Sequence, residues 1–134
     1  MAEAVLVDTD ILIDVGLGVE SARSCLEEIE QRSSLAVSVI SQMELMVGCR
    51  NKTEQRKLDR FLTRTLVVQT TEEISEMAVA LLRDYHLSHG LLIADALIAS
   101  TAISRGMAFI TKNRRDYRFI AQLKPLSYPS KTLT

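Results

Sequence analysis

Short apolar runs alternate with longer amphipathic segments along most of this chain. The runs are rich in aliphatic and β-branched residues and are bounded by polar residues, a pattern that predicts buried strands. The predicted strands cover Ala4–Val7, 35–39, 66–69 and 107–111. One more strand is expected near Leu126, at an edge of the sheet because Pro125 lacks an N–H group.

Between the predicted strands, apolar residues recur with the spacing of a helix that buries one face. The predicted helices cover 20–31, 41–47, 53–62, 72–85 and 93–104. The segment 93–104 is apolar on nearly all sides, which predicts a buried helix that ends at Gly106. Strands that alternate with helices predict an α/β fold, in which a central, mostly parallel sheet carries helices on both faces.

Length and composition fit one folded domain over residues 1–134, with 47% hydrophobic and 25% charged residues. The first residues lack the basic and apolar regions of a signal peptide, and no apolar run reaches the roughly 18 residues of a membrane span. Cys25 and Cys49 follow no metal-binding or redox spacing and are expected to be reduced thiols. A cytoplasmic protein without membrane contact is therefore expected.

The net charge of −1 does not by itself indicate a nucleic-acid-binding protein. Most of the 16 basic residues nevertheless fall into two short segments. The first contains Arg50, Lys52, Arg56, Lys57, Arg60 and Arg64, and the second contains Lys112, Arg114, Arg115 and Arg118. The charge pattern alone fits a solvated surface as well as it fits a phosphate-binding surface beside an acidic site.

Acidic residues are expected to gather at one edge of the predicted sheet. Asp8 ends the first strand, Glu44 lies one turn into the helix after the second, and Asp116 follows the strand that ends at Thr111. Ligands of parallel α/β sheets bind beyond the carboxyl ends of the strands, so these three carboxylates should share a site. Asp95 interrupts an apolar segment, where a charge requires a partner or a cavity.

Each of these acids also has a local interpretation. Asp8 fits the cap of a short helical turn at 11–13, and Glu44 fits a capping box that begins at Ser41. Asp95 fits the first turn of its helix, where an acid complements the helix dipole. None of these local roles predicts that the acids converge, and convergence is the basis of the functional interpretation.

The remaining acids near the motifs carry less information. Asp116 taken alone is most simply a loop residue. Asp10 and Asp14 lie close to Asp8 in sequence but alternate away from it, and are interpreted as solvated or locally hydrogen-bonded.

Converging carboxylates have a chemical consequence. Two of them about 4 Å apart repel by roughly 4 kcal/mol at an effective dielectric constant of 20, so a cluster does not ionise fully without a cation. Hard divalent ions such as magnesium or manganese prefer oxygen ligands. One or two such ions, held by carboxylates and water, provide the arrangement that hydrolyses a phosphodiester bond.

Four segments resemble the motif regions of PIN domains in their order and spacing: VDTDILID, SQMELMVG, IADALIASTA and ITKNRRDY. They extend from Val7 to about Tyr117, and the likeness is greatest to the VapC-type toxins of toxin–antitoxin pairs. The resemblance implies a metal-dependent endoribonuclease. It implies that Asp8, Glu44, Asp95 and Asp116 bind magnesium or manganese, with Thr9, Thr111 and Asn113 as supporting polar residues.

The same resemblance implies partners: an RNA substrate, a second copy of the chain in a homodimer, and a small antitoxin whose tail occupies the active-site groove. On this basis the two basic segments are hypothesised to rim the site and bind RNA phosphates. The residues concerned are Arg50, Lys52, Arg56, Lys112, Arg114 and Arg115. Asp10 stands where the family often has Asn or Ser, and Tyr117 stands where Phe is common; both differences are expected to be harmless.

Other functions are weighed against this one. The domain could be a catalytically inactive module that binds RNA or protein, although an intact acidic quartet argues against a degenerate site. The segment VDTDI also resembles the start of haloacid-dehalogenase-type phosphatases, but the chain lacks the late acidic pair of that family. His86 and His89 fit surface or capping roles better than a shared metal site.

Overall fold

The structure, a computed structural model, describes residues 4–128; the ends of the predicted domain, 1–3 and 129–134, lie outside the described residues. Between these limits, five strands form one parallel sheet in the order β3-β2-β1-β4-β5. The strands are β1 (Ala4–Val7), β2 (Ser34–Ser38), β3 (Leu66–Val68), β4 (Ala108–Ile110) and β5 (Pro125–Leu126). The predicted α/β class and parallel central sheet are confirmed.

The central strand β1 is where the strand order reverses. Val5 pairs with Leu35 of β2 on one side and with Ala108 of β4 on the other. The chain first builds β2 and β3 to one side of β1, and only later returns to add β4 and β5 on the other side. In open α/β sheets, the crevice at such a reversal, beyond the carboxyl ends of the strands, is the usual place for a ligand.

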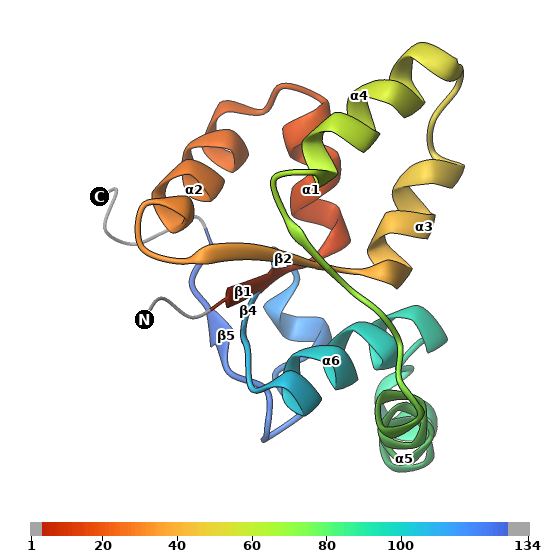
Figure 1. The fold of residues 1–134 in the computed structure, drawn as a ribbon. Coiled ribbons are helices and arrows are strands. Elements are labelled where there is room, and N and C mark those ends of the chain that lie inside the picture. Colours follow the sequence, from red (N-terminus) through yellow and green to blue (C-terminus); the bar gives the residue numbers. More distant parts are fainter. Residues whose placement is uncertain (1–3, 129–134) are drawn as a thin grey trace.

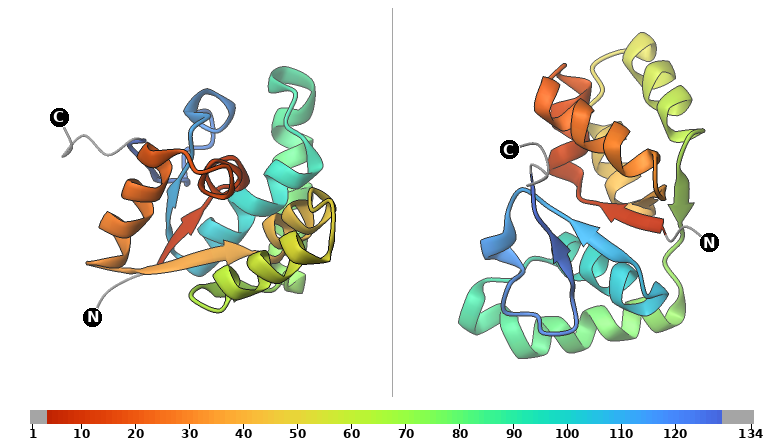
Figure 2. Two further views of the ribbon diagram at one scale, coloured as in Figure 1. Left: turned by 90° about the horizontal axis from the view of Figure 1, so that it is seen from above. Right: turned by 90° about the vertical axis from the view of Figure 1, so that its left-hand side faces the viewer.

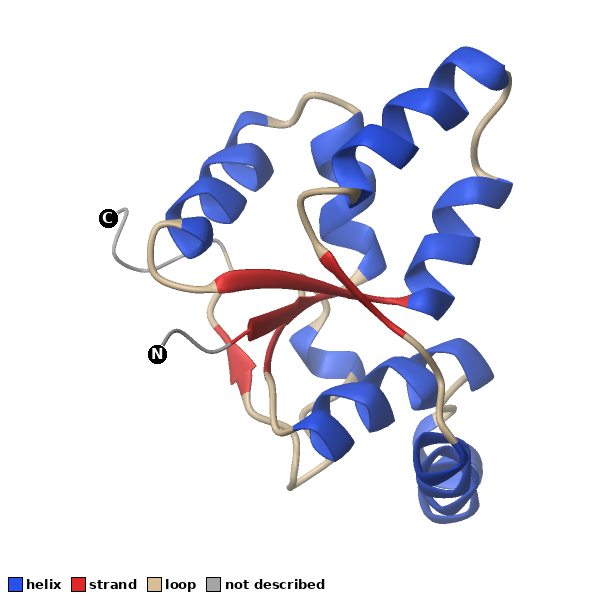
Figure 3. Ribbon diagram, viewed as in Figure 1, coloured by secondary structure: helices blue, strands red, loops and turns tan. Residues whose placement is uncertain are grey.

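Helices cover both faces of the sheet. They are α1 (Thr9–Gly16), α2 (Glu20–Glu30), α3 (Val39–Val47), α4 (Lys52–Leu62), α5 (Glu72–His89) and α6 (Ile93–Arg105). Figures 1 and 3 show α1, α2 and α4 above the strands and α5 and α6 below them. The side view in Figure 2 shows the same two layers on opposite sides of the strands. Across residues 4–128, no helix combines the length and apolar character that a membrane crossing requires.

The alternation of side chains along the strands divides the interior into two apolar layers. Val5 and Val7 of β1 pack with Leu35 of β2 on the side of α1 and α2. Leu6 and Ala36 point the other way and pack against α6. Because both faces are covered, the strands are apolar at successive positions, which is the pattern that predicted them.

Helix α1 is the element that the sequence pattern did not predict beyond a turn at 11–13. It is an eight-residue helix that begins one residue after β1, and it buries Ile11 and Leu12 against the strands. Asp8 caps it by accepting a hydrogen bond from the Thr9 N–H group. The segment TDILID holds only three apolar residues between polar ones, which is too short a run to show a helical period, and the packing of Ile11 and Leu12 stabilises the helix.

Two other helix boundaries differ from the predictions by more than one residue. Helix α3 begins at Val39, because the Ser38 hydroxyl accepts a hydrogen bond from the Ile40 N–H group and caps the helix. Helix α5 continues past Tyr85 to His89, and it ends where Gly90 adopts a left-handed conformation with φ of 69°. Only glycine takes that conformation without strain, so the glycine fixes the end of the helix.

Candidate active site

A cavity of about 190 Å³ lies at the carboxyl edge of the sheet, where β1 and β4 end side by side. Its lining residues come from the start of α1, from α3, from the first turn of α6 and from the loop after β4. They are Asp8, Thr9, Asp10, Ile13, Glu44, Asp95, Asn113, Asp116 and Tyr117. The structure therefore brings the four predicted acids of the quartet to one cavity.

Asp8 is the most deeply buried of these acids, with 4% of its surface exposed. Its Oδ1 accepts a hydrogen bond from the Thr9 N–H group at 2.9 Å, and its Oδ2 accepts one from the Thr111 hydroxyl at 2.7 Å. Burial raises the pKa of Asp8 to about 6, although the two hydrogen bonds act in the opposite direction. Asp8 thus caps α1, as its local interpretation predicted, and also lines the cavity.

Glu44 lies at the exposed rim of the cavity and is held by α1. The Thr9 hydroxyl donates to Glu44 Oε1 at 2.7 Å and lies 2.7 Å from the Ser41 hydroxyl. Since the proton of Thr9 is directed to Glu44, Ser41 donates to Thr9. The capping box proposed for Ser41 and Glu44 is wrong, because Ser38 caps α3 and Ser41 is buried against Thr9.

Asp95 lies in the first turn of α6 and is half-buried. The Tyr117 hydroxyl donates to Asp95 Oδ1 at 3.0 Å. Burial raises the pKa of Asp95, and the nearby carboxylates of Asp116, Glu44 and Asp10 raise it further, while the hydrogen bond from Tyr117 lowers it. The acids of the cavity are therefore close enough to repel one another, as the sequence argument requires.

Asp116 occupies the short 3-10 turn η1 (Arg114–Asp116) after β4, where its N–H group donates to the Asn113 carbonyl at 2.9 Å. Tyr117 follows and is almost fully buried. Burial and the nearby carboxylates of Asp8 and Asp95 raise the pKa of the Tyr117 hydroxyl far above its ordinary range, so it remains a hydrogen-bond donor. The expectation that Tyr117 simply replaces a phenylalanine is incomplete, because its hydroxyl has a partner in the cavity.

The position of Asp10 differs from the prediction. It lines the cavity, and its carboxylate accepts a hydrogen bond from the Asn113 side-chain amide, a residue 103 positions away. Its interpretation as a solvated or locally bonded residue is therefore wrong. The expected alternation is not that of a strand either, because residues two apart in a strand share a face. Helix α1 begins at Thr9 and carries Asp10 into the cavity wall, where Asn113 binds it. Asp14, further along α1, pairs with Lys112 at 2.8 Å.

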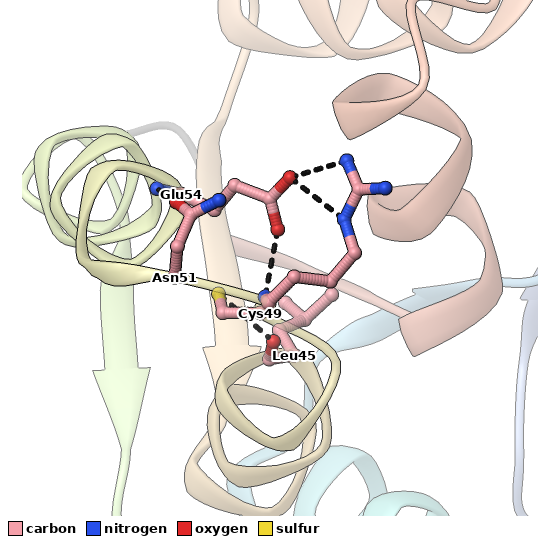
Figure 4. Close-up of polar contacts among 5 residues, drawn as sticks. Leu45, Cys49, Asn51 and Glu54 are labelled. Atoms are coloured by element: carbon pink, nitrogen blue, oxygen red, sulfur yellow. Dashed lines mark hydrogen bonds and ion pairs between the residues drawn. The ribbon is translucent and has the colours of Figure 1, made fainter.

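The first basic segment lies away from the cavity lining. Arg50, in the turn between α3 and α4, donates through its backbone and guanidinium groups to the Glu54 carboxylate at 2.6–3.0 Å. Figure 4 shows Glu54 with the dashed lines of these bonds. Arg50 lines a separate groove between α1, α3 and α4, and with Lys52 it lines a third hollow. Arg56 is exposed on α4. In the same turn, the Cys49 thiol donates to the Leu45 carbonyl, as a reduced cysteine can (Figure 4).

The second basic segment adjoins the acids. Arg114 and Arg115 form the turn that carries Asp116, and both side chains are exposed. Lys112 precedes Asn113 and is paired with Asp14 of α1. Among the described residues that line the cavity, none is a lysine, an arginine or a histidine. The acids of the cavity therefore meet hydroxyl and amide donors, and their charge is not neutralised within the cavity.

The donor set fits a hard divalent cation that keeps part of its hydration shell. The available ligands are carboxylate oxygens, which such cations prefer. In the part of the chain that the structure describes, no three His, Cys, Asp or Glu side chains form a ready-made set of ligands for one ion. Magnesium commonly takes only one or two carboxylates and completes its shell with water and phosphate oxygens, so it does not require such a set.

Comparison with protein families agrees with the fold. The sequence model of the PIN domain matches residues 5–121. The chain belongs to the PIN-domain family. This PIN domain is 37% identical over 122 residues to the Mycobacterium tuberculosis protein named ribonuclease VapC10, and the alignment covers 90% of this chain and 91% of the relative.

Solved structures with the same fold include a chain of a toxin–antitoxin complex and a chain of VapBC2. A toxin–antitoxin complex from Klebsiella pneumoniae contains a chain with a TM-score of 0.77 and 30% identity, covering 93% of this PIN domain and 97% of that chain. VapBC2 from Rickettsia felis, bound to a DNA fragment from its promoter, contains a chain with a TM-score of 0.78 and 26% identity, covering 91% of this PIN domain and 96% of that chain.

Proposed function

We propose that this PIN domain is a metal-dependent endoribonuclease that hydrolyses RNA phosphodiester bonds. The observation that carries the proposal is the cavity at the strand reversal, where acids from separate segments meet without a neutralising cation among the described lining residues. Asp8, Glu44, Asp95 and Asp116 are the proposed ligands of one or two magnesium or manganese ions. The name of the relative, ribonuclease VapC10, supports the same reaction.

Other residues of the chain orient the proposed metal ligands through hydrogen bonds. Thr111 and the Thr9 N–H group fix both oxygens of Asp8, and the Thr9 hydroxyl fixes Glu44. Asn113 restrains Asp10 and, through its N–H group on Thr111, the loop that carries Asp116. A bound divalent cation supplies a water of lowered pKa as the nucleophile and stabilises the leaving oxygen. Because hydrogen bonds already fix these carboxylates, they need little movement to reach the geometry of the reaction.

RNA binding is assigned to the cations around the cavity. Lys112, Arg114 and Arg115 flank Asn113 and Asp116, and are proposed to bind phosphates on either side of the cleaved bond. Arg50, Lys52 and Arg56 lie outside the cavity lining and are proposed to contact only a longer RNA.

The proposed physiological setting is that of a toxin paired with a small antitoxin. The structural relatives from Klebsiella pneumoniae and Rickettsia felis, described as a toxin–antitoxin complex and as VapBC2, support it. A cytoplasmic location and a homodimer belong to the same proposal. Light scattering of the purified chain measures its mass in solution, and a monomer at micromolar concentration would remove the homodimer from the proposal.

The experiment compares purified wild-type protein with Asp8→Asn and Asp95→Asn on RNA, with magnesium or manganese. We expect RNA cleavage that requires the metal and that both substitutions abolish. Asp84→Asn is the matched control, because Asp84 is an exposed acid of α5 outside the cavity. RNA binding without cleavage in any metal would instead indicate an inactive binding module, and hydrolysis of phosphomonoesters would indicate the phosphatase alternative.

A further inference from the structure

Asp95 is held differently from the other acids of the cavity. Three of the other acids receive side-chain hydrogen bonds from short polar residues of α1 and of the loop after β4. These pairs are Asp8 with Thr111, Glu44 with Thr9, and Asp10 with Asn113. Asp95 receives its hydrogen bond from Tyr117, a large side chain that reaches the cavity from the apolar layer between the sheet and α6.

The ring of Tyr117 is fixed by its surroundings. Only 2% of the residue is exposed, and the ring packs edge-on against Phe109 of β4, with ring centres 5.0 Å apart and planes at 74°. Its N–H group donates to the Arg114 carbonyl, and its carbonyl accepts from the Ile120 N–H group. A side chain packed at the density of a protein interior keeps one rotamer, so the hydroxyl is presented at a fixed point in the cavity wall.

The Asp95 carboxylate requires a fixed hydrogen-bond donor to stay in the cavity. It stands in the first turn of α6, where the capping residue Leu92 provides no side-chain hydrogen bond. The neighbouring carboxylates of Asp116, Glu44 and Asp10 repel its charge. Because Asp95 is only half-buried, this repulsion favours rotation of its side chain out of the cavity toward water. A donor in the cavity wall opposes that rotation.

We propose that Tyr117 is a positioning residue, whose hydroxyl keeps the Asp95 carboxylate turned into the cavity. The hydroxyl engages Oδ1, which leaves Oδ2 of Asp95 for a divalent cation. This inference rests on the proposed function, since it assigns to Tyr117 the orientation of one proposed metal ligand. The hydroxyl itself contacts no reacting atom, and its effect on cleavage passes through Asp95.

The test uses Tyr117→Phe, which removes the hydroxyl and keeps the packed ring. Titration with manganese alone, followed by electron paramagnetic resonance, should show a dissociation constant about 10-fold weaker than that of the wild type. Tyr85→Phe is the matched control: Tyr85 is half-buried beside Phe119 and outside the cavity lining, so the manganese affinity of this variant should equal that of the wild type. A hydroxyl with a structural role alone would lower the melting temperature of the metal-free protein and leave the affinity unchanged.

A double variant tests whether Tyr117 acts through Asp95. In the Asp95→Asn background, Tyr117→Phe should weaken manganese binding no further. Equal weakening in both backgrounds, or an unchanged affinity in the single variant, would overturn the inference. The proposed function fails separately, because it falls if the wild type cleaves no RNA with any metal. If the wild type cleaves RNA and Tyr117→Phe binds manganese normally, only the role of Tyr117 is lost.

Discussion

The acidic cavity and the basic turn between α3 and α4 adjoin each other, since Glu44 lines both the cavity and the neighbouring groove. The two regions nevertheless differ in whether their charged side chains have a partner of opposite charge. Arg50 is fully paired with Glu54 on the surface, where each charge stays in contact with water. Asp8 is buried and Asp95 is half-buried, and the side-chain donors that they meet are neutral. The unpaired charges are thus concentrated where the fold also limits their hydration.

This difference indicates which charges in the sequence carry chemical meaning. An exposed pair such as Arg50 and Glu54 contributes little to stability and satisfies its own members. A buried carboxylate without a cationic partner raises the free energy of the folded protein until a cation binds. Segments rich in charge are therefore weaker indicators of function here than single acids inside apolar surroundings.

The largest expected effect comes from removing divalent ions. Chelation should reduce RNA cleavage by more than about 100-fold, and addition of magnesium or manganese should restore it. Manganese should also raise the melting temperature of the wild type but not that of Asp8→Asn, because binding to the folded state alone stabilises it. Cleavage that persists after dialysis against a chelator would contradict the assignment of the cavity.

The next effect concerns the stability of the metal-free protein. Folding raises the pKa of Asp8 from 3.8 to about 6, so the folded state binds a proton that the unfolded chain has released. The stabilisation from this proton is complete below about pH 4 and is lost as the pH rises through 6. Above that pH the ionised carboxylate costs about 3 kcal/mol.

Asp8→Asn removes this cost. In urea unfolding without metal, the variant should gain up to about 3 kcal/mol over the wild type at pH 7.5 and little at pH 4. The gain should disappear when manganese is added, because the wild type then binds the ion and the variant does not. A variant that is less stable than the wild type at pH 7.5 would show that the raised pKa of Asp8 has been misjudged.

A smaller effect is expected from Thr111→Val, a change of similar volume. Thr111 is fully buried and donates to Asp8 Oδ2. Loss of the hydroxyl should destabilise the metal-free protein by about 1 to 2 kcal/mol and raise the pKa of Asp8 further. Thr63→Val is the control, because Thr63 is exposed at the end of α4 and its hydroxyl bonds only the local Arg60 carbonyl. Urea unfolding at pH 7.5 measures both.

The smallest effect separates the two basic segments. Arg115→Ala should weaken RNA binding and reduce the slope of log K against log salt concentration by about 1, the contribution of one phosphate contact. Arg50→Ala should change neither on a short RNA, because Arg50 is paired with Glu54 and lies outside the cavity lining. Equal effects of the two substitutions would extend the RNA-binding surface over the α3–α4 turn.

The sheet could be predicted from the sequence because parallel strands that are buried on both faces consist of consecutive apolar residues, as in Ala4–Val7. The sequence predicted which acids meet because Asp8, Glu44 and Asp116 follow strands whose carboxyl ends share one edge. Their role as metal ligands, and the extent of the domain over 1–134, stay predictions.

Two features escaped the sequence argument for physical reasons. The short helix α1 has only eight residues, and its apolar run at 11–13 predicted no more than one turn, so the place of Asp10 on the cavity wall could not be derived from periodicity. The pairing of Tyr117 with Asp95 joins a loop to a helix through the interior, and neither periodicity nor composition reports such a contact. An apolar segment interrupted by one acid was nevertheless a correct sign that Asp95 faces a cavity.

The hydrogen bond between Asp8 and Thr111 joins residues 103 positions apart, and the bond between Asp10 and Asn113 spans the same separation. A chain still emerging from the ribosome can form β1, β2 and β3 with their helices well before β4 is synthesised. During that interval the acids of α1 lack the loop that completes their surroundings. Translation itself therefore delays the completion of the cavity until the segment that follows β4 has been made.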